Sequence, residues 1–254
     1  MADASKDCGV TFELQERRSK YSARKGDVAQ IGCLSERCEM GALMKTEMLL
    51  NALVNDAEVG LKLERSVSVA LISGAIIAGA LFFPAIGFRT DIGYAMETVR
   101  FLLKFAITLP LAVAATAALL RAARPGASFG LSGWALAISP VVLATGVLAE
   151  LLAVPPSLWI TRLVGSNARN CVTLIPLLSI GPLACLLFAL RVGAPTRPGL
   201  AGAIAGLAAS GIAATFYATN CTDDSPLFVM TWYPAATGLV VLLGYLGGVR
   251  FLRW

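Results

Sequence analysis

The sequence has no histidine among its 254 residues and few charged ones. The first absence excludes a catalytic triad, a general base or a metal site that depends on an imidazole. Charged residues make up 15% of the chain, whereas soluble domains carry about 25%. Together with a mean hydropathy of +0.73, this shortage excludes an ordinary soluble fold and predicts an integral membrane protein.

Aromatic residues are also scarce, at 8% of the chain. An outer-membrane barrel needs girdles of aromatic side chains and short alternating strands, whereas this chain has long continuous apolar runs. Because helices are the only other structures that can cross a bilayer, the sequence predicts an all-α integral membrane protein.

Six apolar segments, each close to the roughly 20 residues that span a bilayer, are predicted to form transmembrane helices. They cover residues 67–88, 101–120, 131–154, 171–190, 199–219 and 227–249, which together form a predicted membrane domain over 67–254. An even number of spans places both termini on one side of the membrane. The lipid bilayer is therefore an expected partner.

The distribution of basic residues predicts the orientation. With the N-terminus in the cytoplasm, 16 Lys and Arg residues lie inside and 5 lie outside, although the loops alone differ little. The basic residues form no single run with interleaved aromatics, so no direct nucleic-acid binding is expected. We therefore predict that the N-terminal segment and the C-terminus are cytoplasmic. Cys171 and Cys221 are predicted to face the exterior.

The polar N-terminal part divides in two. Residues 1–43 form an irregular extension with too few apolar residues for a core, and translation from Met44 is an alternative that N-terminal sequencing would test. Residues 44–66 are predicted to be helical, with a stripe at steps of three and four residues. This stripe either lies along the bilayer or docks a soluble partner; its residues are Met48, Leu49, Ala52, Leu53 and Asp56.

Cys171 and Cys221 each follow an Asn where a polar loop meets an apolar run. Cys171 is predicted to begin a helix two residues after Arg169, and both features favour a thiolate. Asp223 and Asp224 follow Cys221, with Asp224 or Ser225 as a helix cap. One interpretation is structural: the two cysteines form an inert disulfide bridge or remain two separate thiols. The other is functional: they form a redox or soft-metal sensor, with Arg169, Asp223 and Asp224 as supporting residues.

Other polar residues have simpler interpretations. Cys185 is predicted to be a packed apolar residue, and the N-terminal cysteines have no partner set that would make a metal site. Lys104 and Glu150 lie near predicted helix ends and are expected to reach the membrane interface with their charged groups. On this view no ionisable residue is buried, which argues against a small six-span transporter or export component, the alternative function.

Met44 to Trp254 resembles the NrsF-type membrane anti-sigma factors of proteobacteria. The resemblance is carried by six blocks taken together: Leu49 to Leu53, Cys171 with Ile175 to Ser179, Arg191 to Pro198, Cys221 to Pro226, Trp232 with Tyr233, and Arg250 to Trp254.

This resemblance implies a membrane-bound regulator in the bacterial inner membrane, not an enzyme, and no cofactor or metal. A cytoplasmic helix would hold an extracytoplasmic-function (ECF) sigma factor through residues 48–63, with Leu49, Leu53 and Asp56 foremost. Cysteines matching Cys171 and Cys221 would sense metal or oxidant stress in the periplasm. A chemical change at these two cysteines would shift the packing of the last three spans and free the sigma factor.

Overall fold

The computed structural model describes residues 62–123, 130–193 and 195–252, all within the unit Ala57–Trp254. The predicted sigma-binding residues and the extension 1–43 lie outside this range. Over the described residues the chain forms helices without strands. Six segments in this part are long and apolar enough to cross a membrane, which confirms the predicted all-helical fold with six apolar spans.

The spans and the short helices between them follow the predicted order. They are the first span Lys62–Ala85, α3 Ile92–Ala95, α4 Val99–Ala122, α5 Gly130–Ala135, α6 Ile138–Ala153, η1 Pro156–Leu158, α7 Trp159–Val164, α8 Ala168–Leu190, α9 Pro198–Ala218 and α10 Pro226–Phe251. The third predicted span is divided into α5 and α6, and the fourth apolar segment includes η1, α7 and α8.

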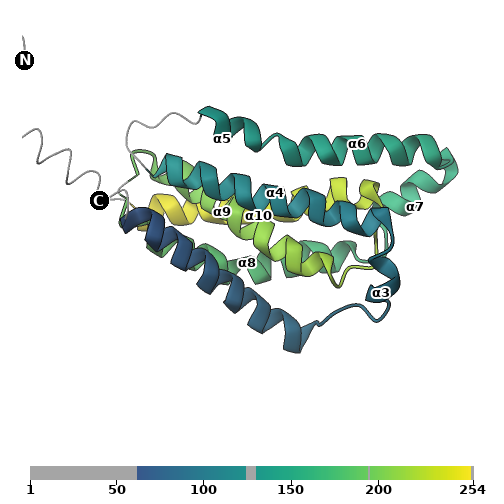
Figure 1. The fold of residues 1–254 in the computed structure, drawn as a ribbon, viewed down its shortest axis with the longest axis horizontal. Coiled ribbons are helices and arrows are strands. Elements are labelled where there is room, and N and C mark those ends of the chain that lie inside the picture. The colour runs from purple at the N-terminus through teal and green to yellow at the C-terminus, as the bar shows by residue number, and fades with distance from the viewer. Residues whose placement is uncertain (1–61, 124–129, 194, 253–254) are drawn as a thin grey trace, which may run out of the picture. The chain divides into compact units, whose positions relative to one another are not determined.

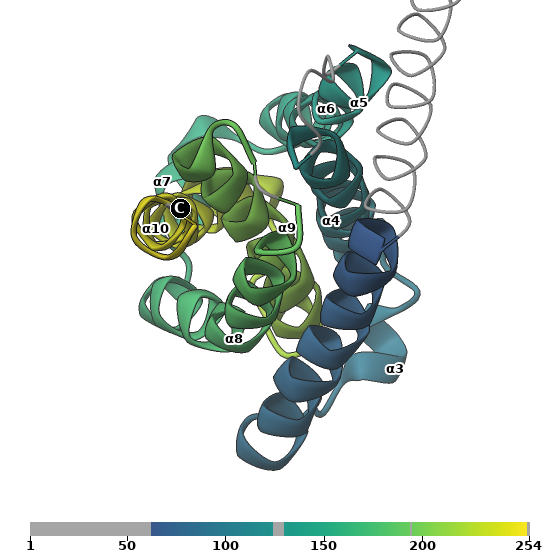
Figure 2. The same ribbon diagram turned by 90° about the vertical axis from the view of Figure 1, so that its left-hand side faces the viewer.

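Helix α9 is the centre of the bundle. Two-thirds of its apolar window is buried, 67%, against 17% to 39% for the other spans. It contacts α10, α4 and α8 most extensively. The views in Figures 1 and 2 place α5 and α6 along one side of the bundle and the first span along the other.

Glycines allow α9 and α10 to approach closely. A Cβ added at Gly202 would lie 2.2 Å from the carbonyl oxygen of Gly244, and one added at Gly244 would lie 2.3 Å from that of Gly202. Only residues without a side chain permit this separation between backbones. These glycines form a packing surface inside the bundle.

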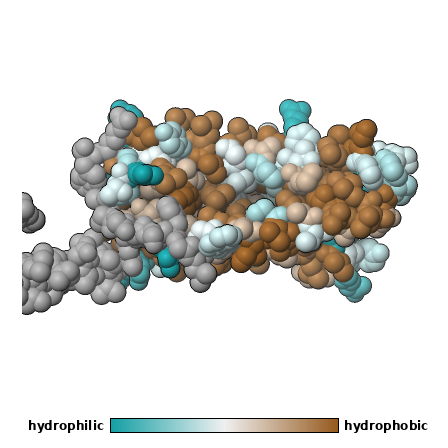
Figure 3. All heavy atoms as spheres, turned by 90° about the horizontal axis from the view of Figure 1, so that it is seen from above, coloured by the Kyte–Doolittle hydropathy of each residue, from teal (hydrophilic) through white to brown (hydrophobic). Residues whose placement is uncertain are grey.

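The outer faces of the bundle are apolar. Large hydrophobic side chains are exposed on several spans, and apolar residues cover much of the face seen in Figure 3. Exposed apolar area of this extent suits contact with lipid. The described residues thus have the form of a multi-pass membrane protein.

Lys62 and Leu252, the first and last described residues, lie at one end of the bundle. Figure 1 shows the beginning of the first span and the end of α10 together, whereas α3, α7 and the connection from α9 to α10 lie at the opposite end. Leu63 is buried in an apolar cluster with Leu119, Leu190 and Ala201. The start of the first span is therefore packed against α4, α8 and α9.

Candidate functional site

The connection between α9 and α10, residues 219–225, carries Cys221 and is here called the thiol loop. Its first turn is held by the amide groups of Asn220 and Cys221, which both donate to the carbonyl oxygen of Tyr217 at 3.0 Å. Ser225 occupies the N-cap position of α10, and Pro226 begins the helix. The Ser225 hydroxyl lies 3.4 Å from Glu150 Oε1 and makes no capping hydrogen bond, although its N-cap position agrees with the prediction.

Asp223 connects the thiol loop to the N-terminus of α8. Its Oδ2 accepts hydrogen bonds from the backbone amides of Asn167 at 2.7 Å and Ser166 at 2.9 Å. Gly165 precedes them with a φ of +59°, and a side chain there would meet Asp223 and Phe228. Backbone donors just before a helix suit a carboxylate, because they are otherwise unpaired and the helix dipole is positive there.

Asp224 connects the same loop to α4 and to the segment before α3. Its Oδ1 lies 2.6 Å from Lys104 Nζ, and its Oδ2 lies 2.9 Å from Arg89 Nη1. The ammonium group of Lys104 also donates to the carbonyl oxygen of Cys221 at 2.9 Å. Two adjacent carboxylates therefore bind two different parts of the bundle.

Arg89 is shared between Asp224 and Asp91. Its Nε lies 2.7 Å from Asp91 Oδ1, and its side chain is 8% exposed. The hydrogen bond with Asp91 raises the pKa of Arg89 despite its burial, and the same hydrogen bond lowers the pKa of the exposed Asp91 carboxyl. Both groups are charged at neutral pH, so the Arg89 guanidinium keeps its positive charge beside Asp224.

The prediction that no ionisable residue is buried, with Lys104 and Glu150 extending their charged groups out of the bundle, is wrong. Lys104 is 1% exposed and Glu150 is 4% exposed. Lys104 pairs with Asp224, while Glu150 pairs with Arg162 and, at 3.0 Å, with Arg100. The partners come from distant parts of the sequence, and they allow burial that would otherwise be costly.

Cys171 and Cys221 lie in one buried apolar cluster with Tyr217, Phe228 and Tyr233. Both are free thiols, 0% and 1% exposed respectively. Burial raises the pKa of the Cys221 thiol, and the nearby Lys104 charge opposes this rise only in part. We call this set the thiol cluster; Cys221 belongs both to this cluster and to the thiol loop.

Arg169 does not accompany Cys171 into the cluster. Its side chain is exposed, whereas Cys171 is buried. Residues two positions apart on a helix point in different directions. The cations close to the thiol loop are Lys104 and Arg89.

One feature of the sequence indicates that ion pairs form among these residues, which we call the ionic network. Five basic and five acidic residues lie on this side of the predicted spans: Arg89, Arg100, Lys104, Arg162, Arg169, Asp91, Glu97, Glu150, Asp223 and Asp224. Such a balance favours pairing among them. Which residues pair depends on the packing of the helices, and the sequence pattern alone does not contain that information.

A family profile described as "NrsF: Negative regulator of sigma F" matches residues 53–254. The chain belongs to the NrsF family. It is 32% identical to the anti-sigma-F factor NrsF of Caulobacter vibrioides (strain NA1000 / CB15N) over 215 residues, which are 83% of this chain and 100% of that protein.

A second NrsF relative has the same similarity. The probable anti-sigma-F factor NrsF of Azospira oryzae (strain ATCC BAA-33 / DSM 13638 / PS) is 32% identical over 214 residues, 83% of this chain and 100% of that protein. No solved structure matches. The predicted family resemblance is confirmed, and the NrsF family match includes the whole ionic network and both cysteines of the cluster.

Proposed function

We propose that this protein is a membrane-bound anti-sigma factor that holds an ECF sigma factor at the cytoplasmic face and releases it when the thiol cluster is modified from the periplasm. The observation that carries the proposal is the match to negative regulators of sigma F over residues 53–254. A sigma factor is accordingly the proposed partner, and no catalytic step is needed.

The site supports a sensing role for Cys171 and Cys221. Cys221 lies in a loop whose two carboxylates bind different parts of the bundle, and Cys171 lies in the same apolar cluster as Cys221. Oxidation or metal binding adds volume or charge to a closely packed cluster, which cannot accept it without moving its neighbours. Such movement would displace α8, α9 and α10, the last three spans.

The opposite end of the same helices supports the route to the cytoplasmic segment. Leu63 packs in an apolar cluster with residues of α4, α8 and α9, and it is the last residue of the proposed sigma-binding segment 48–63. A change in the packing of these helices would alter the anchoring of that segment. A coupling free energy of about 1–3 kcal/mol, roughly 5- to 150-fold in affinity, is usual for such regulation.

The partner is tested by affinity capture from detergent-solubilised membranes, followed by mass spectrometry. The tagged full-length protein should recover a sigma factor, and a version that starts at Leu63 should not. Within the segment, Leu49→Ala with Leu53→Ala should reduce recovery, whereas Asn51→Ala, off the apolar stripe, should not. If the full-length protein recovers no sigma factor from unstressed cells, the proposal fails.

The sensor is tested in cells with a reporter gene controlled by the captured sigma factor. Cys171→Ser with Cys221→Ser should abolish induction by metal or oxidant while leaving repression intact. Cys185→Ser is the matched control, because Cys185 lies deeper in α8 and packs against the other apolar cluster. Normal induction in the double variant, at normal membrane levels, would show that the cysteines are not the sensor.

The buried charges do not favour the transporter alternative. Lys104 and Glu150 are ionisable and buried, so one argument against transport no longer holds. Both are nevertheless neutralised by specific partners near the helix ends. Transport pathways place such groups toward the middle of the membrane or along a water-filled cavity.

A further inference from the structure

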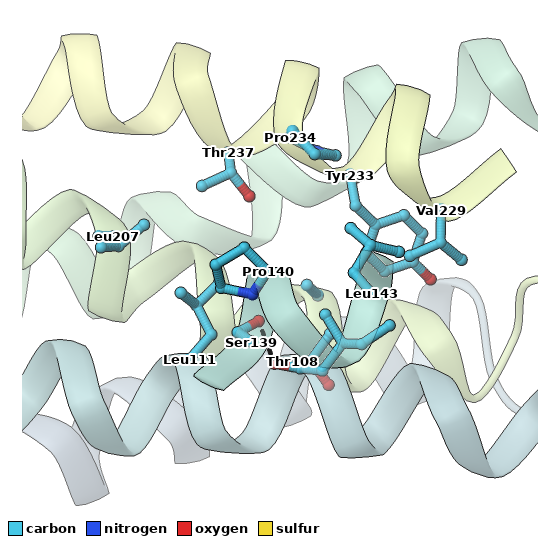
Figure 4. A pocket seen from close by; sticks show the side chains of 12 residues that line it. Thr108, Leu111, Ser139, Pro140, Leu143, Leu207, Val229, Tyr233, Pro234 and Thr237 are labelled. Carbon is cyan, nitrogen blue, oxygen red and sulfur yellow. Dashed lines mark hydrogen bonds between the residues drawn. The ribbon is translucent and has the colours of Figure 1, made fainter. Parts of the chain in front are cut away.

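Charged side chains in the described part of the membrane unit lie toward the two ends of the bundle. Between the ends, the largely apolar pocket among α4, α6, α9 and α10 is lined by no charged residue (Figure 4). Five of the six Asp and Glu residues in the described ranges lie at the thiol-loop end, and the sixth is Glu64 in the first span. The two ends therefore differ in the carboxylates they offer to basic residues.

The basic residues at the two ends differ in the same way. Four of the five at the thiol-loop end form ion pairs with carboxylates of this chain: Arg89, Arg100, Lys104 and Arg162. At the opposite end, Arg191, Arg197 and Arg250 are exposed and form no ion pair with a carboxylate of the described residues. Because a guanidinium is always charged in proteins, three positive charges there are available to an external anion.

These three arginines lie where the ends of α8, α9 and α10 meet. Arg191 is the C-cap of α8, Arg197 is the N-cap of α9, and Arg250 is in the last turn of α10. A Cβ added at Gly248, two residues before Arg250, would lie 2.3 Å from the carbonyl oxygen of Pro198, which follows Arg197. Helix α8 contacts both α9 and α10. We call Arg191, Arg197 and Arg250 the arginine cluster.

The arginine cluster borders side chains that suit contact with lipid. The Arg191 guanidinium lies over the ring of Phe188, 5.5 Å from its centroid, and Phe188 is 69% exposed. Phe251 follows Arg250 directly and is also exposed. Basic side chains beside lipid-facing apolar residues extend their charged groups to the level of the headgroups. The anion nearest to these guanidinium groups is then a lipid phosphate.

We propose that the arginine cluster binds the headgroup of an anionic phospholipid, with guanidinium groups donating to phosphate oxygens. A guanidinium presents paired N–H donors that match two oxygens of a phosphate group. A zwitterionic lipid offers the same phosphate together with its own cation, so the cluster favours anionic lipids. Each basic residue near an anionic membrane surface contributes about fivefold in affinity. The proposal does not depend on the proposed anti-sigma function.

The test is native mass spectrometry of the full-length protein in detergent with dioleoylphosphatidylglycerol or, as the matched probe, dioleoylphosphatidylcholine. The two lipids have the same acyl chains, so the difference in affinity of the first bound lipid reports the headgroup alone. We expect phosphatidylglycerol to bind at least about fivefold more tightly. Glycerophosphoglycerol, the same headgroup without chains, should not displace it. Displacement at equal concentration would show a site for a free anion and overturn the assignment to lipid.

Arg191→Gln, Arg197→Gln and Arg250→Gln should each weaken binding of the first phosphatidylglycerol about fivefold, and the triple variant should lose most of the preference. Phosphatidylcholine affinity should stay that of the parent, which also shows that the variants fold. Arg169→Gln is the matched control, because it removes an exposed cation at the carboxylate-rich end. Equal affinities of the two lipids for the parent, or an unchanged preference in the triple variant, would overturn the proposal.

Discussion

At the scale of single residues, the Lys104–Asp224 pair links the thiol loop to α4. Replacing Lys104 with Met would leave a largely buried carboxylate with Arg89 as its remaining cation. We expect a loss of about 3 kcal/mol of unfolding free energy, since breaking a buried pair by removing one partner typically costs that much.

Thermal or denaturant unfolding in detergent measures this loss. Lys104→Met with Asp224→Asn should recover part of it, because the second change removes the carboxylate that has lost one of its two cations. Arg169→Met is the control, as it removes an exposed cation on the same side of the bundle. An unchanged midpoint in Lys104→Met would show that the pair does not stabilise the loop.

The burial of Cys221 predicts its reactivity with pH. Because burial raises the pKa of this thiol, less thiolate is present at neutral pH than for an exposed cysteine. Alkylation by iodoacetamide requires the thiolate, so the rate profile of Cys221 should be displaced to higher pH than in the unfolded chain.

Mass spectrometry of the labelled peptide gives this profile for native and denatured protein. Asp224→Asn, which weakens the loop's link to Lys104 and Arg89, should increase the native rate at pH 7. Identical native and denatured profiles would mean that the loop does not protect the thiol.

At the scale of helices, the α9–α10 contact predicts a sharp difference between two glycines. Gly202→Ala would place a Cβ 2.2 Å from the Gly244 carbonyl oxygen, whereas at Gly238 nothing lies within 4 Å. We expect Gly202→Ala to destabilise the protein by about 1–3 kcal/mol through overpacking. Gly238→Ala should be neutral or stabilising by up to about 1 kcal/mol, because Ala favours helix.

Comparison of the two variants in the same unfolding assay isolates packing from helix propensity. Equal stability of both would contradict the close approach of the two helices. The comparison is informative because both substitutions add the same methyl group to a helix interior.

The helices themselves were largely predictable from the sequence. Apolar runs of bilayer length located all six spans, because that requirement depends on composition and not on tertiary contacts. The described helix of the first span already includes Lys62, before the predicted start at residue 67, and Leu63 and Val67 are buried while Lys62, Glu64 and Arg65 are exposed. Hydropathy marks the apolar part of a helix and does not mark its end.

The ionic network was not predictable in the same way. Lys104 pairs with a residue 120 positions later, and Glu150 pairs with residues from two other segments. Local pattern contains no information on such pairs. The two cysteines could be placed at the same end of the bundle from the span count, whereas their burial depends on how the helices pack.

At the scale of the whole molecule, the orientation can be tested by labelling with a membrane-impermeant maleimide. In a background without other cysteines, Tyr94→Cys, at a position 74% exposed, lies at the thiol-loop end, and Arg197→Cys lies at the opposite end. We expect labelling of the first in intact cells and of the second only after permeabilisation. The reverse pattern would invert the predicted topology and place the cysteines on the cytoplasmic side.

Asp223 and Asp224 are neighbours in the chain, yet one is held at the start of α8 and the other by α4 and Arg89. A disturbance that reaches one carboxylate detaches only one side of the loop. On the proposed mechanism, weak stress would then produce a partly opened form with an output between repression and full release. The dose of the stressor would be reported in proportion, without a threshold.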